Sequence, residues 1–154
     1  MCDEKTKIRF GTGGWRAVIG DDFIKENIRR VAQGIVALMK SEGKTDKPVI
    51  IGYDRRFMSE EAAEWVTEVL CGNGIRVKTL RRSAPTPLIM FIVKNEGLHY
   101  GIEITASHNP SIYNGIKLIV EEGRDASVEC TEKLESLIDA SDVVSTDIAS
   151  AEAA

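Results

Sequence analysis

The sequence predicts an α/β protein, a three-layer α/β/α sandwich built around a mixed, mostly parallel sheet. Two features of the sequence carry this prediction. Short runs of Val, Ile and Leu alternate with longer stretches whose apolar residues recur every three or four positions. Glycine or proline marks most of the boundaries between these runs. The length of 154 residues suits one domain, and no repeat of solenoid type interrupts the alternation.

Four stretches have the spacing and end signals of helices. The first, residues 23–41, repeats Ile, Val and Leu on one face and closes near Gly43. The second begins with Ser59 as its cap and has two glutamates in its first turn, where they face the positive end of the helix dipole. In the third, Thr86 is the cap and Pro87 the first helical residue. The expected helices are residues 23–41, 59–72, 86–96 and 126–139.

Continuous apolar runs between these helices predict strands. PVIIGYD, residues 48–54, is typical of a strand that is covered on both faces. Residues 7–20 are expected to form two short strands around a glycine turn, and the last strand is expected to follow an Asn114-Gly115 turn. The other expected strands are residues 75–80, 99–105 and 115–120.

Residues 1–140 are expected to form the domain. From residue 141 the chain loses its periodicity and ends in small residues. We therefore expect residues 141–154 to be a linker, or a truncated connection to a missing second domain.

Composition excludes several classes of function. The net charge of −4 gives no reason to expect nucleic acid or an anionic membrane as a partner. No apolar run reaches the roughly 18 residues of a membrane helix, and the first residues lack the apolar core of a signal peptide. Cys2, Cys71 and Cys130 are odd in number and far apart, so neither a disulfide framework nor a zinc site is indicated. A reducing cytoplasm is the expected location.

Residues 103–115, EITASHNPSIYNG, are the strongest candidate for chemistry. Open α/β sheets bind ligands beyond the carboxyl ends of their strands, which is where the expected strand delivers Ser107. A serine hydroxyl needs a neighbouring base or a metal to become a nucleophile, and His108 and Lys117 are the nearest candidates in the sequence. These residue types also favour turns, so the spacing alone leaves open that Ser107, His108 and Asn109 only cap and turn the chain.

Three motifs together resemble one family. TASHNPSIYNGIK at residues 105–117 is similar to the phosphoserine loop of the α-D-phosphohexomutase superfamily, the phosphoglucomutases and phosphomannomutases. FGTGGWR at residues 10–16 resembles the amino-terminal phosphate-site loop of that family, and GYDRR at residues 52–56 supports the match. The motifs occur in the family's order and cover essentially the whole chain as its first, amino-terminal domain.

The resemblance implies a mechanism. Ser107 would carry a phosphoryl group, donate it to a hexose phosphate and recover the other phosphate of the resulting sugar bisphosphate, so that hexose 1-phosphate and hexose 6-phosphate interconvert. A Mg²⁺ ion would be bound through the phosphate on Ser107, with its remaining ligands on a domain that this chain lacks. Hexose 1,6-bisphosphate would be activator and intermediate. The isolated chain is therefore expected to be inactive, with the remaining domains of the parent enzyme as partners and a hexose phosphate as substrate.

The resemblance also assigns site roles. The expected catalytic residues are Ser107, His108, Lys117 and Arg16, and the expected substrate-binding residues are Arg16, Asn109 and Lys117. Asp54 and Arg55 are expected to support the site from a neighbouring strand end, whereas Arg56 receives no role. Each of these has a plainer interpretation: a surface lysine, an exposed arginine on a hairpin, or surface ion pairs of little energy.

Two other classes of function remain open. The same scaffold can serve as a non-catalytic phosphate-binding or interaction module, because such folds host many functions. A receiver-like phosphorylation switch is the third possibility, but it needs an acidic cluster at the strand ends, and Asp54 alone fits.

Overall fold

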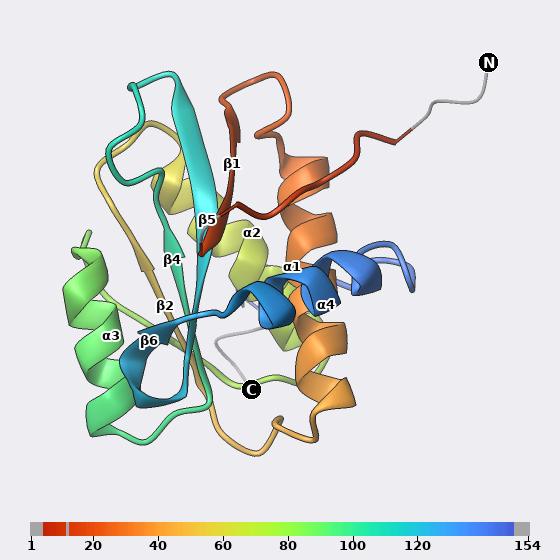
Figure 1. Ribbon diagram of the computed structural model, residues 1–154, viewed down its shortest axis with the longest axis vertical. Coiled ribbons are helices and arrows are strands. Elements are labelled where there is room, and N and C mark those ends of the chain that lie inside the picture. The colour runs from red at the N-terminus through yellow and green to blue at the C-terminus, as the bar shows by residue number, and fades with distance from the viewer. Residues whose placement is uncertain (1–4, 12, 150–154) are drawn as a thin grey trace.

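The computed structural model describes residues 5–11 and 13–149, and its strands form one mixed sheet (Figure 1). The strand order is β1-β5-β4-β2-β3, and the short β6 pairs with the other edge of β5. β2 is parallel to β3 and to β4, whereas β5 is antiparallel to β1, β4 and β6. The strands are β1 (Gly14–Val18), β2 (Val49–Tyr53), β3 (Val77–Thr79), β4 (Tyr100–Ile104), β5 (Tyr113–Val120) and β6 (Arg124–Asp125).

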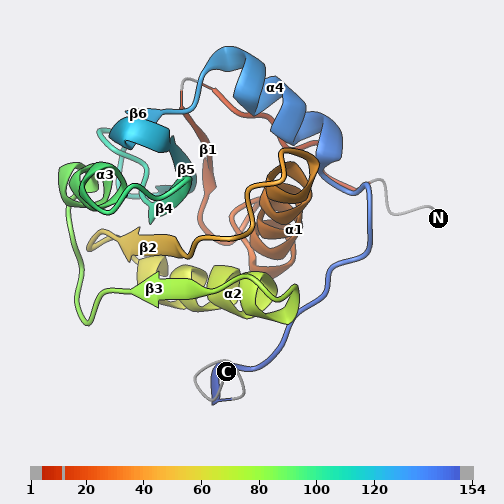
Figure 2. The same cartoon turned by 90° about the horizontal axis from the view of Figure 1, so that it is seen from below.

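Helices cover both faces of this sheet, which confirms the predicted layered α/β class (Figure 2). α3 lies on one face and encloses a small apolar cluster around Ile89 and Val93. α1, α2 and α4 lie on the other face over the main core, to which the sheet contributes buried residues such as Ile102 and Leu118. The helices are α1 (Lys25–Ser41), α2 (Ser59–Gly72), α3 (Thr86–Asn95) and α4 (Val128–Leu137), with a short 3₁₀ helix, η1 (Glu121–Gly123), before β6.

Buried apolar side chains explain why these segments adopt these elements. In α1 the residues Ile28, Val31, Ile35 and Leu38 are all fully buried, and they recur at the three- and four-residue spacing of one helix face. All five residues of β4 are buried, as a strand must be when helices cover both of its faces.

The predicted starts of α2 and α3 are displaced by one residue, because each predicted cap is the first helical residue. The cap of α2 is Met58, at φ 63°, and Ser59 is the first helical residue. The Ser59 hydroxyl contacts side chains and not the helix amides: it donates to a carboxylate oxygen of Asp54 and accepts from the Asn114 amide, each at 2.8 Å. Likewise Pro85 precedes α3, and Thr86 is its first residue.

The predicted Asn114-Gly115 turn is wrong, because both residues lie inside β5. The Asn114 side chain is fully buried, and its amide donates to the carbonyl of Phe57 at 3.0 Å and to the hydroxyl of Ser59 at 2.8 Å. The glycine beside it permits close packing: a Cβ on Gly115 would lie 2.1 Å from the carbonyl oxygen of Trp15. The stretch 7–20 also differs from expectation, since its described residues form one strand, β1, with an isolated bridge from Gly11 to Gly14.

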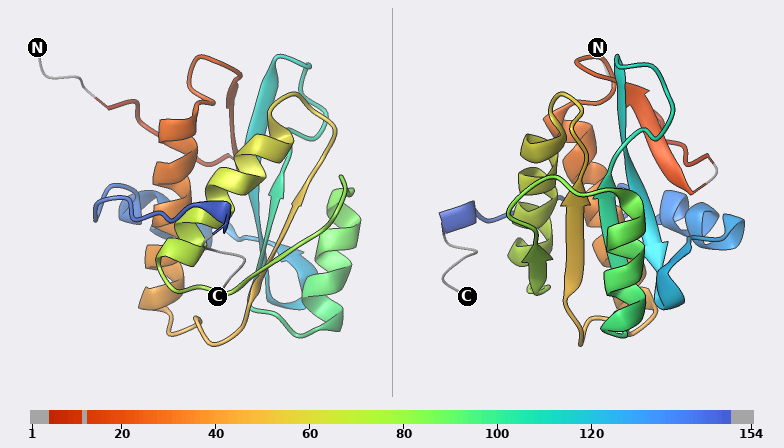
Figure 3. Two further views of the ribbon diagram at one scale, coloured as in Figure 1. Left: turned by 180° about the vertical axis from the view of Figure 1, so that it is seen from behind. Right: turned by 90° about the vertical axis from the view of Figure 1, so that its left-hand side faces the viewer.

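Residues 141–149 pass across the middle of α1 and lie against the second half of α2 (Figure 3). The amide of Val144 donates to the Gln33 side chain at 3.0 Å, and the amide of Thr146 donates to the carbonyl of Glu68 at 3.0 Å. The expected connection is thus held against the domain as far as it is described, and residues 150–154 lie outside the described part. No described helix is both long and apolar enough to cross a membrane.

Candidate active site

Ser107 lies in the connection from β4 to β5, directly beyond the carboxyl end of β4. Its side chain is exposed, and its backbone is in the left-handed region at φ 54°. For a residue other than glycine this conformation costs roughly 1–2 kcal/mol, so the surrounding loop must hold it. The amide of Ser107 donates to the hydroxyl of Thr105 at 3.0 Å, and the amide of Asn109 donates to the carbonyl of Ala106 at 3.0 Å.

Arg56 lies outside this loop and makes most of the side-chain hydrogen bonds that hold it. Its guanidinium donates to four backbone carbonyls, those of Ser107 at 2.8 Å, Asn109 at 2.7 Å, Pro110 at 2.9 Å and Tyr113 at 3.0 Å. A planar guanidinium has several donors in a fixed geometry, so one side chain can fix a whole turn. The sequence prediction gave Arg56 no role and placed the supporting role on the adjacent Arg55 instead.

Asp54 connects the end of β2 to the serine loop. One carboxylate oxygen accepts from the Thr105 hydroxyl at 2.7 Å and lies 3.4 Å from Nε of Arg56. The other oxygen accepts from the hydroxyl of Ser59 and from the amide of Arg56. Since Thr105 in turn accepts from the Ser107 amide, Asp54 supports the serine through a single intermediate. In Figure 1 the β2–α2 and β4–β5 connections accordingly lie together at one end of the sheet.

Arg16 comes from the opposite side, on β1. Its guanidinium is exposed and donates to the side-chain carbonyl of Asn109 at 2.7 Å, so the structure brings these two predicted residues together beside the serine. The strands approach closely here, because a Cβ on Gly14 would lie 2.9 Å from the carbonyl oxygen of Ile116. A small depression at this point is lined by Gly13, Gly14, Trp15, Arg16, Thr105, Ser107, Ile116 and Lys117.

Lys117 reaches that depression from β5, where it faces Gly14 in the register with β1. Its side chain is 24% exposed, and its ammonium pairs with the carboxylate of Asp125 at 2.8 Å. Asp125 is half exposed, so this ion pair is weak and the ammonium can be attracted elsewhere. Pairing of β5 with β1 therefore brings Lys117 to the same depression as Ser107.

His108 and Arg55 are not brought into this group by any contact. His108 is exposed, and no described residue hydrogen-bonds to its ring. Arg55 is exposed too and reaches the Ser83 hydroxyl at 3.4 Å, away from the serine loop. The supporting contacts that were expected of Arg55 are made by Arg56.

Glu103 is a second residue that sequence reasoning missed. It lies in β4 with a fully buried carboxyl group, and burial, assisted by the negative charge of Asp54 and opposed by Lys117, raises the pKa of Glu103 to about 8. A signal was available, since a glutamate in the middle of the apolar run YGIEI is unusual.

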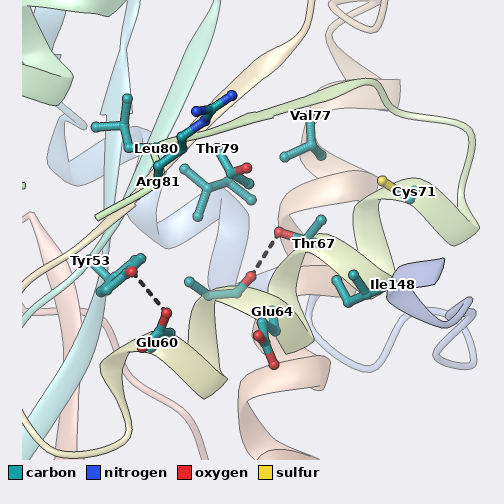
Figure 4. A pocket seen from close by; sticks show the side chains of 12 residues that line it. Tyr53, Glu60, Glu64, Thr67, Cys71, Val77, Thr79, Leu80, Arg81 and Ile148 are labelled. Carbon is teal, nitrogen blue, oxygen red and sulfur yellow. Dashed lines mark hydrogen bonds between the residues drawn. The ribbon is translucent and has the colours of Figure 1, made fainter. Parts of the chain in front are cut away.

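A larger hollow of about 510 Å³ lies elsewhere, between α2 and the edge strand β3 (Figure 4). Tyr53 donates to Glu60 across its mouth, and Cys71 and Ile148 line its far end. None of the predicted catalytic or substrate-binding residues lines it. Its larger volume is therefore no reason to place the chemistry in this hollow and not in the depression at Ser107.

The described residues do not by themselves fit a complete magnesium site. Mg²⁺ prefers several oxygen ligands in octahedral order. Within residues 5–11 and 13–149 there is no group of three or more His, Cys, Asp or Glu side chains that could hold a metal ion. Ser107, once phosphorylated, would offer phosphate oxygens and would need further ligands from another part of an enzyme.

The fold and the site together indicate a class of protein, one that binds or transfers phosphate. An α/β domain presents an exposed serine at a strand end, in a strained and braced loop, with an arginine and a lysine around the same depression. Cations placed in this way around a hydroxyl are typical of sites that handle phosphate.

Comparison with known proteins gives the family. The family model for phosphoglucomutase/phosphomannomutase, alpha/beta/alpha domain I, matches residues 7–144. The chain belongs to this family.

Its relatives are several times longer than the chain itself. A phosphoglucomutase of Staphylococcus saprophyticus is 35% identical over 134 residues, which are 85% of this chain and 24% of the relative. A phosphoglucomutase of Staphylococcus haemolyticus is 36% identical over 141 residues, which are 86% and 25% of the two chains. The chain thus spans about a quarter of the length of the curated relatives it matches.

Solved structures of similar proteins have the same fold. A Thermus thermophilus protein described as a phosphomannomutase superposes with a TM-score of 0.84 at 30% identity, covering 92% of this chain and 32% of that one. The parafusin phosphoglucomutase of Paramecium superposes with a TM-score of 0.73 at 22% identity, covering 87% and 25%, and supports the fold alone.

Proposed function

We propose that this chain is the phosphoserine-bearing first domain of a phosphohexose mutase, which interconverts hexose 1-phosphates and hexose 6-phosphates. The observation that carries the proposal is Ser107 itself: an exposed serine at the carboxyl end of a strand, in a left-handed conformation that four carbonyl contacts from Arg56 maintain. The names of the relatives supply the class of substrate.

Ser107 would act as the carrier of the phosphoryl group. In the forward step the bond between phosphorus and the serine oxygen breaks, a bond to a hydroxyl oxygen of the hexose phosphate forms, and that hydroxyl loses its proton. In the second step the other phosphate of the bisphosphate returns to the serine oxygen, and a proton returns to the sugar. Hexose 1,6-bisphosphate is thus the intermediate, and any of it that escapes could phosphorylate the serine again.

Lys117 and Arg16 are the groups of this chain best placed to assist. Both line the depression at Ser107, so their positive charges would stabilise the transferring phosphoryl group. Lys117 is also the candidate for moving the proton of the sugar hydroxyl, and its side chain is only partly exposed. His108 stays a candidate for proton transfer, since an exposed ring beside Ser107 is free to turn toward a substrate. Asn109 positions Arg16 through its side-chain carbonyl.

Mg²⁺ remains part of the proposal as a group shared with other domains. When bound, it would neutralise negative charge on the transferring phosphate. The contribution of this chain would be the phosphate oxygens on Ser107, because its described residues do not provide the other ligands.

Because the chain spans about a quarter of its relatives, sugar recognition and grip on the distal phosphate would be supplied by the remaining domains. We therefore expect no mutase turnover from the chain alone. A coupled assay with glucose 1-phosphate and a trace of the 1,6-bisphosphate tests this directly, and robust turnover would refute it. A cytoplasmic location belongs to the same proposal and is supported by the free thiols of Cys71 and Cys130.

A domain exchange tests the function. Residues 7–144 would replace the matching domain of the Staphylococcus haemolyticus relative, and conversion of glucose 1-phosphate to glucose 6-phosphate would be measured. We expect the chimera to turn over, Ser107→Ala to abolish turnover, and Ser111→Ala, an exposed serine in the same loop, to leave it nearly unchanged. Turnover that survives Ser107→Ala would overturn the proposal.

A further inference from the structure

Glu103 is a titratable residue in the middle of a fully buried strand. It is 0% exposed, and neither of its carboxyl oxygens has a hydrogen-bond partner among the described residues. Burying a charge without a partner is strongly unfavourable, and an unpartnered buried polar group calls for a specific explanation. Neither the core of the domain nor the steps attributed above to Ser107 make use of this carboxyl group.

The pairing of β2 with β4 leaves room for the Glu103 carboxyl group. In the sheet register Glu103 faces Gly52 on β2 and Lys117 on β5. A Cβ on Gly52 would lie 2.3 Å from Oε2 of Glu103 and 2.5 Å from the side chain of Ile89. The missing side chain at Gly52 therefore makes the room for the carboxyl group, and Ile89 of α3 closes that room from the helix side.

The charged groups that act on Glu103 are those of the Ser107 site. From the end of β2, Asp54 opposes its ionisation, and from β5, Lys117 favours it. Lys117 is itself paired with Asp125 of β6, and α3 presents the apolar Ile89 at this point. Burial is the largest influence, and together with Asp54 it outweighs Lys117, so the pKa of Glu103 lies near 8 and the group is mostly the neutral acid at pH 7.

We propose that Glu103 is a positioning residue of the Ser107 site that acts through Lys117, and that its protonation is linked to the phosphate on Ser107. The inference rests on the proposed function insofar as Ser107 carries a phosphoryl group. It adds a regulatory property of that site, namely uptake of a proton in mildly alkaline solution when the serine is phosphorylated.

Two effects of a phosphate on Ser107 act in the same direction. The phosphate brings nearly two negative charges to the depression that Lys117 lines, which makes a second negative charge on Glu103 less favourable. It also draws the ammonium of Lys117 toward itself, and so removes the one influence that favours the Glu103 carboxylate. Both effects raise the proton affinity of Glu103.

The link is reciprocal. If phosphorylation raises the pKa of Glu103, then a protonated Glu103 must by the same free energy favour the phosphorylated serine. As the neutral acid, Glu103 leaves Lys117 to the phosphate. As a carboxylate, it would compete for the ammonium and weaken its hold on the phosphate. Retention of the phosphoserine would therefore decline as the pH rises through the titration of Glu103.

Carboxyl ¹³C NMR of the glutamate-labelled chain measures the titration directly. The resonance of Glu103, assigned by its loss in Glu103→Gln, is followed from acid to alkaline pH in two forms, one with Ser107 and one with phosphoserine installed at position 107 during translation. We expect a midpoint near 8 in the unphosphorylated chain. Phosphoserine should raise it by about one pH unit. A midpoint in the ordinary glutamate range, or one that phosphoserine leaves unchanged, overturns the proposal.

Lys117→Gln tests the route through the lysine. Removing the ammonium should raise the midpoint in the unphosphorylated chain and shrink the effect of phosphoserine, whereas an unchanged midpoint contradicts a role for Lys117. If Lys117→Gln does not fold, the comparison of the Ser107 and phosphoserine forms decides alone. Because the phosphoserine is installed without any enzyme reaction, a failure of Ser107 to be phosphorylated by hexose bisphosphate would count against the proposed function and would leave this test intact.

Discussion

Ser107 combines an exposed hydroxyl with a backbone conformation that serine rarely adopts. At φ 54° the residue projects from the end of β4 without continuing the strand, which turns its side chain out of the sheet and toward the depression shared with Arg16 and Lys117. Only glycine adopts this conformation without steric cost, so the contacts of the surrounding loop must hold the serine in it.

Substitutions at Ser107 separate strain from chemistry. Ser107→Gly should relieve the left-handed strain and unfold at a free energy about 1 kcal/mol higher than Ser107→Ala, while both lose the acceptor oxygen. Urea denaturation of the two variants measures the difference. A glycine variant no more stable than the alanine variant would show that the loop does not hold position 107 under strain.

Arg56 and Arg55 form a matched pair for a second prediction. Arg56→Met leaves four backbone carbonyls without their charged donor and should lower the free energy of unfolding by roughly 2 kcal/mol. Arg55→Met should change it by less than about 0.5 kcal/mol, because the side chain is exposed and has one long contact to Ser83. Equal effects at the two positions would contradict the distinction drawn between them.

At the scale of elements, β2 and β4 contain one pair of facing positions whose side chains are complementary in size. Gly52 and Glu103 face one another in the parallel register, and the glycine leaves the space that the carboxyl group fills under Ile89 of α3. Asp54 and Thr105, which follow these strands, then meet to support the serine loop. The strand pairing thus places the supporting residues as well as the core.

Gly52→Ala tests this matching. The added methyl group meets Glu103 and Ile89 at less than van der Waals distance, so we expect a loss of about 2 kcal/mol in the free energy of unfolding. In a double-mutant cycle Glu103→Ala should recover part of that loss. Additive effects of the two substitutions would mean that the side chains do not share one space.

The same scale shows what local sequence can and cannot predict. Helix and strand positions followed from periodicity, because burial on one face leaves a local pattern. The prediction of an Asn114-Gly115 turn was wrong because the partners that hold Asn114 in a strand, Phe57 and Ser59, are distant in sequence. For the same reason no local feature distinguished Arg56 from Arg55, whereas the motif around Ser107 was visible in a continuous stretch.

At the scale of the whole molecule, Glu103 links stability to pH. Below about pH 4.5, its ordinary pKa, the group is protonated in the folded and the unfolded chain, and its contribution is fully present. As the pH rises toward about 8, the unfolded chain releases this proton while the folded chain keeps it, so stability is lost. On the acid side Asp139 acts oppositely, because its hydrogen bond with Arg30 lowers the pKa of Asp139 and its contribution is lost as the pH falls.

The pH dependence can be assigned with one substitution. Between pH 5 and pH 8 the free energy of unfolding should fall by up to about 1.4 kcal/mol per pH unit through Glu103. Glu103→Gln, which cannot ionise, should remove most of that slope. Chemical denaturation at several pH values provides the comparison, and an identical slope in the variant would show that Glu103 titrates normally.

The central claim, that Ser107 carries the phosphoryl group, is tested most directly by locating phosphate on the active chimera that contains residues 7–144. Intact-mass analysis followed by phosphopeptide mapping should find one phosphoryl group on Ser107 after incubation with glucose 1,6-bisphosphate, and none in Ser107→Ala. An active chimera whose phosphate lies on another residue, Ser111 included, or that carries no phosphate at all, would contradict the account.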